Sequence, residues 1–143
     1  MISQLKGKTV KQIFMDQDNL KFVTDDGDFC FQVYGDCCSV SYFNDFYGVR
    51  NLLENGAILE VKGVKLTDEE EKRFTARLDA KKEYYDQLQF YGYRFTTNHP
   101  EFGLVSSVFS FRNDSNGYYG GSLGSVSQIK EGVPEIFNDV IET

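Results

Sequence analysis

The sequence lacks several features that would place it in a well-defined class of protein. It has no tryptophan, two prolines, one histidine and three cysteines in 143 residues. The cysteines are Cys30, Cys37 and Cys38. Because their number is odd and two are adjacent, we expect free thiols rather than a set of disulfide bonds. No apolar run approaches the ~20 residues of a membrane span, and residues 1–10 lack the hydrophobic stretch of a signal peptide. We therefore expect a soluble, cytoplasmic protein.

What the chain has in quantity is aromatic residues and acidic charge. Aromatics make up 15% of the residues, which favours strands, because aromatic side chains fit the pleated, half-buried surface of a sheet. The net charge of −7 argues against a general nucleic-acid binder, which needs clustered Lys and Arg for the phosphates. An acidic surface still allows a local pocket for one anionic ligand. The length suits a single domain over residues 1–143.

Period-2 alternation of apolar residues predicts an antiparallel sheet. In residues 29–34, Phe29, Phe31 and Val33 alternate with more polar neighbours, the pattern of a strand with one buried face. Residues 16–19 and 25–28 have turn composition, so the first three strands should form a meander. The strands expected are 9–15, 20–24, 29–34, 57–64, 87–98, 104–113 and 118–126.

Three short helical segments are expected beside the sheet. The first would be capped by Asp36 or Ser39 and run through Phe46, and the second would span residues 49–54 and end at Gly56. The third would begin at Pro134 and run to residue 141. The fold class expected is therefore α+β: a single domain dominated by an antiparallel sheet, with short helices.

Residues 67–86 differ in character from the rest of the chain. They hold seven acidic and five basic residues, and Thr67 to Glu70 has the pattern of a capping box. Asp68 and Lys72 form an acid-before-base pair at helical spacing. We expect a charged helical insertion, either lying over the domain or in an oligomer contact, or with no direct function.

The residues give little support for catalysis or for bound metal. His99 is the only histidine, no Cys-x-x-C occurs, and the Asp-rich turns do not continue with EF-hand spacing. A reactive thiolate at Cys37 or Cys38 is weighed against ordinary packing of a buried thiol. No phosphate-loop or dinucleotide motif is present. We expect no enzyme, no metal and no cofactor.

Binding of a nucleotide-like ligand suits the residues better. Such a ligand needs flat faces for stacking and bidentate donors for phosphate. If the apolar faces of residues 87–98 and 104–113 coincide, Arg94 and Arg112 lie together on the opposite face. The alternative is that the aromatics are core and the arginines pair with carboxylates. The candidates are Arg94, Arg112 and Arg50 for phosphate, Asn116 for a base edge, and Tyr91, Tyr93, Phe95, Tyr118 and Tyr119 for stacking.

Asn116-Gly117 carries a strong hairpin signal, because both residues tolerate the positive φ of a type I′ turn. Tyr118 and Tyr119 would then project to opposite faces of the next strand. Two segments, Asp36-Cys37-Cys38 and Ser115-Asn116-Gly117-Tyr118-Tyr119, together resemble a family of small phage and bacterial proteins that carry an Asp-Cys-Cys and a Ser-Asn-Gly-Tyr-Tyr motif. The similarity spans most of residues 7–125. The chain departs from the pattern where Gly120-Gly121 replaces a polar Ser-Glu pair, and in residues 67–86.

The chain is also similar to phage anti-Thoeris proteins, sponges that sequester the cyclic ADP-ribose signals of bacterial TIR-domain immunity. This resemblance implies a non-enzymatic phage protein in the host cytoplasm that binds a small cyclic nucleotide and forms a homo-oligomer. The arginines cannot be carried over residue by residue. The alternatives are an acidic inhibitor of a host defence nuclease such as a CRISPR effector, through Asp25, Asp26, Asp28 and residues 69–71, or a phage accessory protein without a ligand. No membrane contact is expected.

Overall fold

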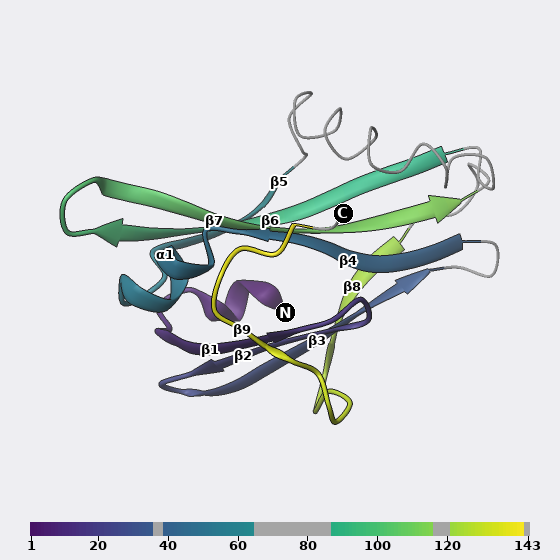
Figure 1. Ribbon diagram of the computed structural model, residues 1–143, viewed down its shortest axis with the longest axis horizontal. Helices are drawn as coiled ribbons and strands as arrows, with labels where there is room; N and C mark the ends of the chain where they lie inside the picture. Colours follow the sequence, from purple (N-terminus) through teal and green to yellow (C-terminus); the bar gives the residue numbers. More distant parts are fainter. Residues whose placement is uncertain (36–38, 65–86, 116–120, 142–143) are drawn as a thin grey trace.

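The computed structural model describes residues 1–35, 39–64, 87–115 and 121–141, with side chains over 1–34, 41–63, 92–111 and 123–141. Within these ranges the strands form two antiparallel sheets that pack face to face (Figure 1). The chain is thus a small, mostly β domain. The part of the α+β expectation that holds is the dominance of antiparallel sheet.

The first sheet is built from the expected N-terminal meander. The turn between the strands 10–15 and 19–24 is closed by the Asp16 carboxylate, which accepts hydrogen bonds from the backbone N–H groups of Asp18 and Asn19 at 2.8 and 2.7 Å. The next turn, before the strand 27–35, uses Gly27 at a φ of +106°. In spatial order the strands are β8 (Gly121–Val126), β3 (Gly27–Gly35), β2 (Asn19–Thr24), β1 (Val10–Met15) and β9 (Glu135–Ile136).

The second sheet contains the two longest strands, which form one hairpin without a register shift from Gln87↔Ser115 to His99↔Gly103. The two long strands expected at 87–98 and 104–113 are therefore confirmed, and they pair with each other. In spatial order the strands are β4 (Ser39–Tyr47), β7 (Gly103–Ser115), β6 (Gln87–His99) and β5 (Glu60–Val64).

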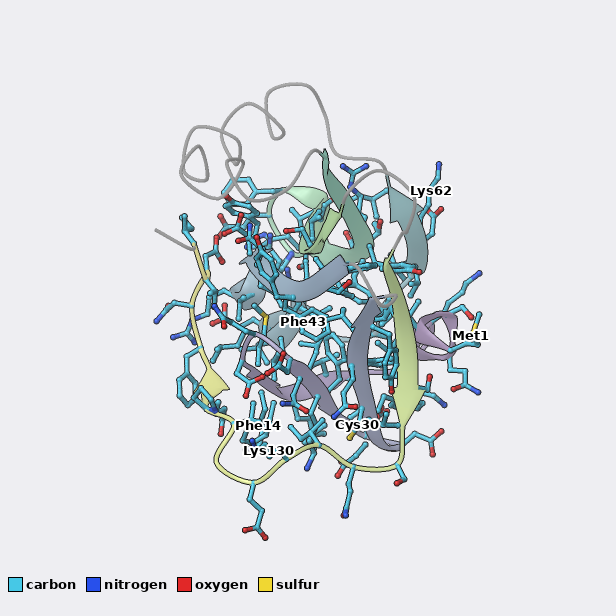
Figure 2. All side chains as sticks on the ribbon, turned by 90° about the vertical axis from the view of Figure 1, so that its right-hand side faces the viewer. Met1, Phe14, Cys30, Phe43, Lys62 and Lys130 are labelled. Atoms are coloured by element: carbon cyan, nitrogen blue, oxygen red, sulfur yellow. The ribbon has the colours of Figure 1, made fainter. Side chains whose placement is uncertain are left out.

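The core between the sheets is aromatic. The Phe22 ring lies 6.1 Å from the Phe31 ring within the first sheet, and 5.5 and 6.3 Å from the Phe95 and Phe109 rings of the second. These centroid separations and tilted planes are typical of favourable aromatic pairs. Figure 2 shows Phe43 in this interior, between the two layers. The aromatic content that predicted strands thus supplies the contact between the sheets.

Two connections cross from one sheet to the other at the same corner. Gly35 pairs with Gly121 at the end of the first sheet, and Ser39 pairs with Ser115 at the end of the second. The expected hairpin at Asn116-Gly117 is wrong: β7 pairs with β4 and β6, whereas β8 pairs with β3. Residues 36–38 and 116–120 themselves lie outside the described ranges.

The expected helix ending at Phe46 is also wrong, since Ser39–Tyr47 is strand β4. A β-bulge lies between Phe43 and Phe46 and lets both side chains enter the core although they are three residues apart. That spacing of three imitates a helical period in the sequence. The helix expected at 49–54 is confirmed as α1 (Val49–Glu54), followed by Gly56 at a φ of +75°.

The C-terminal segment is a strap along one side of the sandwich rather than the expected helix from Pro134 (Figure 1). The Pro134 carbonyl accepts a hydrogen bond from Met15 N–H at 3.0 Å, and β9 continues the pairing with β1. Val140 then exchanges two backbone hydrogen bonds with Phe46 at the edge of β4, at 2.9 and 3.0 Å. These edge strands offer backbone partners that a helix could not use.

The remaining described element is the short 3-10 helix η1 (Ile2–Leu5). The charged insertion expected at 67–86 lies outside the described residues. Of the helices in the described ranges, none is long and apolar enough to cross a membrane.

Candidate functional site

The backbone register places two of the sequence candidates on one face of the second sheet. Tyr93 and Phe109 face each other across β6 and β7 on the inner side, with their rings stacked 5.7 Å apart. Because side chains alternate along a strand, Arg94 and its register partner Val108 belong to the outer face. Arg112 is four residues beyond Val108 in the same unbroken register, so its position shares that face. Its side chain lies outside the described part.

Arg94 has a second cation directly beside it. Lys62 of β5 is its register partner on the other side of β6. Among the described residues, neither side chain has an ion-pair partner within 4.0 Å. The Nε atom of Arg94 is buried and has no hydrogen-bond acceptor in the part of the chain that the structure describes. In Figure 2 Lys62 extends from the margin of the molecule, away from the interior that holds Phe43.

Two like charges opposite each other in a sheet are normally unfavourable, and a buried guanidinium N–H normally finds an acceptor. This chain carries 22 acidic residues, so carboxylates to neutralise the pair are abundant in the sequence. Yet none of the carboxylates in the described ranges lies within 4.0 Å of Arg94 or Lys62. The arrangement has the chemistry of an anion site, in which a phosphate would supply both the missing charge and the missing acceptor.

A buried polar pair lies two strands from Arg94 on the same sheet. The bulge in β4 sets Asn44 and Asp45 opposite Ser110 of β7, and these residues are 2%, 0% and 2% exposed. The amide of Asn44 donates to the Asp45 carboxylate at 2.6 Å, and the backbone N–H of Asp45 donates to the Ser110 hydroxyl at 3.4 Å. The Oδ1 atom of Asn44 is buried without a partner.

Small residues separate the polar pair from the cations. Ser110 pairs with Gly92, which lies between Phe90 and Arg94 on the outward positions of β6 and has no side chain. At this position β6 and β7 therefore place no bulky side chain on this side of the sheet. We call the side of the second sheet that faces away from the core the polar face; it consists of Asn44, Asp45, Lys62, Gly92, Arg94 and Ser110, of which Lys62 is exposed, Arg94 is half-buried and the others are buried.

Of the remaining sequence candidates, three have described side chains and the others do not. Phe95 is fully buried and stacks on Phe109 at 5.8 Å, so the expectation that it offers a ligand face is wrong. Tyr93 packs against the core from a half-buried position. Arg50 is exposed on α1 and pairs with Glu54 at 3.3 Å. Asn116, Tyr118 and Tyr119 lie outside the described residues, as does the side chain of Tyr91.

Sequence reasoning missed Lys62, Asn44, Asp45 and Ser110. Lys62 is one of many lysines until the β5–β6 register pairs it with Arg94. Asn44-Asp45 was assigned to a helix, where two adjacent polar residues would need no explanation. The signal that could have found them is the run of aromatics on both sides, which indicates burial of the polar residues between them.

The described cysteine has the character of a structural thiol. Cys30 is 5% exposed and forms no disulfide bond, as expected from the number of cysteines. Burial raises the pKa of its thiol, and the neighbouring Lys21 only partly opposes this. In the described part of the chain, no group of three or more His, Cys, Asp or Glu side chains could hold a metal ion.

Comparison with protein families gives one match. The model of the family described as "Domain of unknown function (DUF7448)" matches residues 3–124, which covers both sheets except β9 and the end of β8. Comparison with curated proteins and with solved structures gives no match. The residues beyond the matched range include the C-terminal strap, whereas every residue of the polar face lies inside it.

Proposed function

We propose that this chain, which belongs to the DUF7448 family, is a non-enzymatic binding protein that sequesters a small phosphorylated nucleotide. The first ligand class to test is the cyclic ADP-ribose type, because the chain resembles the phage anti-Thoeris proteins that sequester it. On this proposal the protein acts in the host cytoplasm as a homo-oligomer, and the polar face holds the phosphate.

The observation that carries the proposal is the Arg94–Lys62 pair. Two adjacent cations in a chain of net charge −7, without an ion-pair partner among the described residues, form a local positive site in a negative molecule. A bidentate guanidinium with a neighbouring ammonium is the donor set that phosphate prefers. The sequence also predicts that Arg112 binds phosphate. Its backbone position lies on the same face of the sheet as that of Arg94, so it remains part of the proposal.

A thermal-shift experiment with cyclic ADP-ribose isomers and cyclic oligonucleotides tests the proposal. A ligand that binds only the folded protein stabilises it by about 2.7 kcal/mol at a hundredfold excess over its Kd. Arg94→Gln and Lys62→Gln should each reduce the shift, whereas Lys11→Gln, an exposed lysine on the other sheet, should leave it unchanged. Sedimentation of the free and liganded protein measures the proposed self-association.

The proposal fails if no member of the panel shifts the melting temperature, or if the Arg94 and Lys62 variants respond like the parent protein. Because Lys11→Gln removes the same charge at a remote site, an equal loss in that variant would mean that net charge alone is responsible.

The nuclease-inhibitor alternative gains less support from the described residues. A nucleic-acid mimic needs carboxylates that are free to face a partner. On the β2–β3 hairpin, Asp26 and Asp28 instead pair with Lys8 and Lys21, and Asp25 accepts a hydrogen bond from Thr9 N–H at 2.9 Å. These contacts tie the acidic turn to its own sheet. Salt-sensitive binding to a defence nuclease, with no response to nucleotides, would favour this alternative.

A further inference from the structure

We infer that the polar face also recognises the sugar or base of its ligand, through the carbonyl oxygen of Asn44. The ligand class is then a nucleoside phosphate. Its phosphate would lie at β6, and a hydroxyl or amino hydrogen of its sugar or base would lie at β4, two strands away. This inference rests on the proposed function, because it assigns the part of the ligand that the Arg94–Lys62 pair does not hold.

The orientation of the Asn44 amide follows from its neighbour. The side-chain NH2 of Asn44 donates a hydrogen bond to the carboxyl group of Asp45 at 2.6 Å. The carbonyl oxygen consequently points to the other side of the amide. There it is buried and finds no donor among the described residues. The residue is 2% exposed, so bulk water does not replace the missing partner.

A buried acceptor without a donor is rare in folded proteins and calls for a specific cause. The acceptor here shares its sheet with a buried donor that also lacks a partner, the Nε of Arg94. The two groups are complementary in sign but come from β4 and β6, with β7 between them. Neighbouring strands are ~4.8 Å apart, so the backbones of β4 and β6 are separated by roughly 10 Å, and neither atom is the hydrogen-bond partner of the other.

A ligand that satisfies both groups needs an anion at one end and a hydrogen-bond donor at the other. A nucleotide has this composition: its phosphate accepts, and its ribose hydroxyls or base amino group donate. Inorganic phosphate or pyrophosphate could occupy the cation end but is too short to carry a donor across the roughly 10 Å from β6 to β4. Ser110 and Gly92, the small residues between the two ends, leave the centre of the face free of long side chains.

Isothermal titration calorimetry with two probes, cyclic ADP-ribose and pyrophosphate, separates the two ends of the site. The parent protein should bind cyclic ADP-ribose at least about tenfold more tightly than pyrophosphate, the worth of one good hydrogen bond. Asn44→Leu, which keeps similar volume and removes both the acceptor and the NH2 that donates to Asp45, should abolish this preference in a variant that folds. Arg94→Gln should weaken both probes.

Each failure has its own signature. If the parent binds both probes equally, or if a folded Asn44→Leu variant keeps the preference, the inference is overturned while the phosphate site stands. If neither probe binds the parent protein, the inference is overturned, and the proposed function fails with it when the thermal-shift panel gives no response either. The comparison of probes on the parent protein needs no substitution, so a variant that does not fold leaves that test intact.

Discussion

The backbone of Gly48 lies so close to the Ser106 carbonyl that a Cβ atom on Gly48 would be 2.5 Å from that oxygen. Gly48 precedes α1 and has a φ of +71° and a ψ of 30°. Its own carbonyl accepts hydrogen bonds from the Ser107 hydroxyl at 2.6 Å and from Leu52 N–H at 3.2 Å. One glycine therefore sets both the start of the helix and its contact with β7.

Gly48→Ala should strongly destabilise the fold. The left-handed conformation costs a non-glycine residue about 1–2 kcal/mol, and overpacking against rigid backbone costs roughly 1–3 kcal/mol more. Urea unfolding should therefore show a loss of about 2–5 kcal/mol. Gly56→Ala is the matched control, because Gly56 has a similar φ of +75° but nothing within 4 Å of an added Cβ. It should lose only the conformational part, and equal losses in the two variants would contradict the clash.

Much of the fold follows from local pattern, and the exceptions have a common cause. The meander from Val10 to Gly35 and the long β6–β7 hairpin carry clear period-2 alternation, so their pairing was predictable. Strand β4 breaks this period with its bulge, and the strap from Pro134 has almost no period of its own. In both cases the partner strands, which lie far away in sequence, determine the conformation.

The candidate site was predictable only in part for the same reason. Alternation of side chains places Arg94 and Arg112 on a common face if the apolar faces of β6 and β7 lie on the same side of the sheet. The register confirms that they do, since Tyr93 pairs with Phe109. The pairing of Lys62 with Arg94 depends on the β5–β6 register, which the sequence does not encode locally. Asn44 requires both the bulge and the knowledge that its neighbours are buried.

Cys30 should be almost unreactive in the folded protein. Burial limits access of a reagent to its thiol and raises its pKa, so less of the nucleophilic thiolate forms at neutral pH. Alkylation by iodoacetamide at pH 7, followed by peptide mass mapping, should modify Cys30 at least about tenfold more slowly than in urea. Equal rates in the two conditions would show that the first sheet does not protect the thiol.

The ion pair between Lys8 and Asp26 should make stability depend on acidic pH. The hydrogen bond and charge of Lys8 lower the pKa of the Asp26 carboxyl from its ordinary value of 3.8. A lowered folded-state pKa means that the stabilisation is complete above pH 3.8 and is lost as the pH falls through the lower folded-state value. The stability difference between the parent protein and Asp26→Asn should therefore shrink below that pH.

Lys8→Gln removes the other partner and should show the same pH dependence in urea unfolding. Since Lys8 and Asp26 act on each other, the double variant should lose less stability than the two single losses added together. Additive losses, or a difference that persists unchanged in strong acid, would rule out the pair as the source.

The geometry of the Arg94–Lys62 pair distinguishes charge from hydrogen bonding in ligand recognition. Arg94→Lys keeps the charge but loses the planar fork and the buried Nε donor, so cyclic ADP-ribose should bind about tenfold more weakly, as for the loss of one charge-assisted hydrogen bond. Lys62→Arg keeps the charge at an exposed position and should bind with nearly the parent Kd. Raising the salt concentration should weaken binding less in Lys62→Gln than in the parent, because one screened attraction has been removed. If Arg94→Lys binds as tightly as the parent protein, the fork does not hold the phosphate, and the polar face attracts the ligand by charge alone.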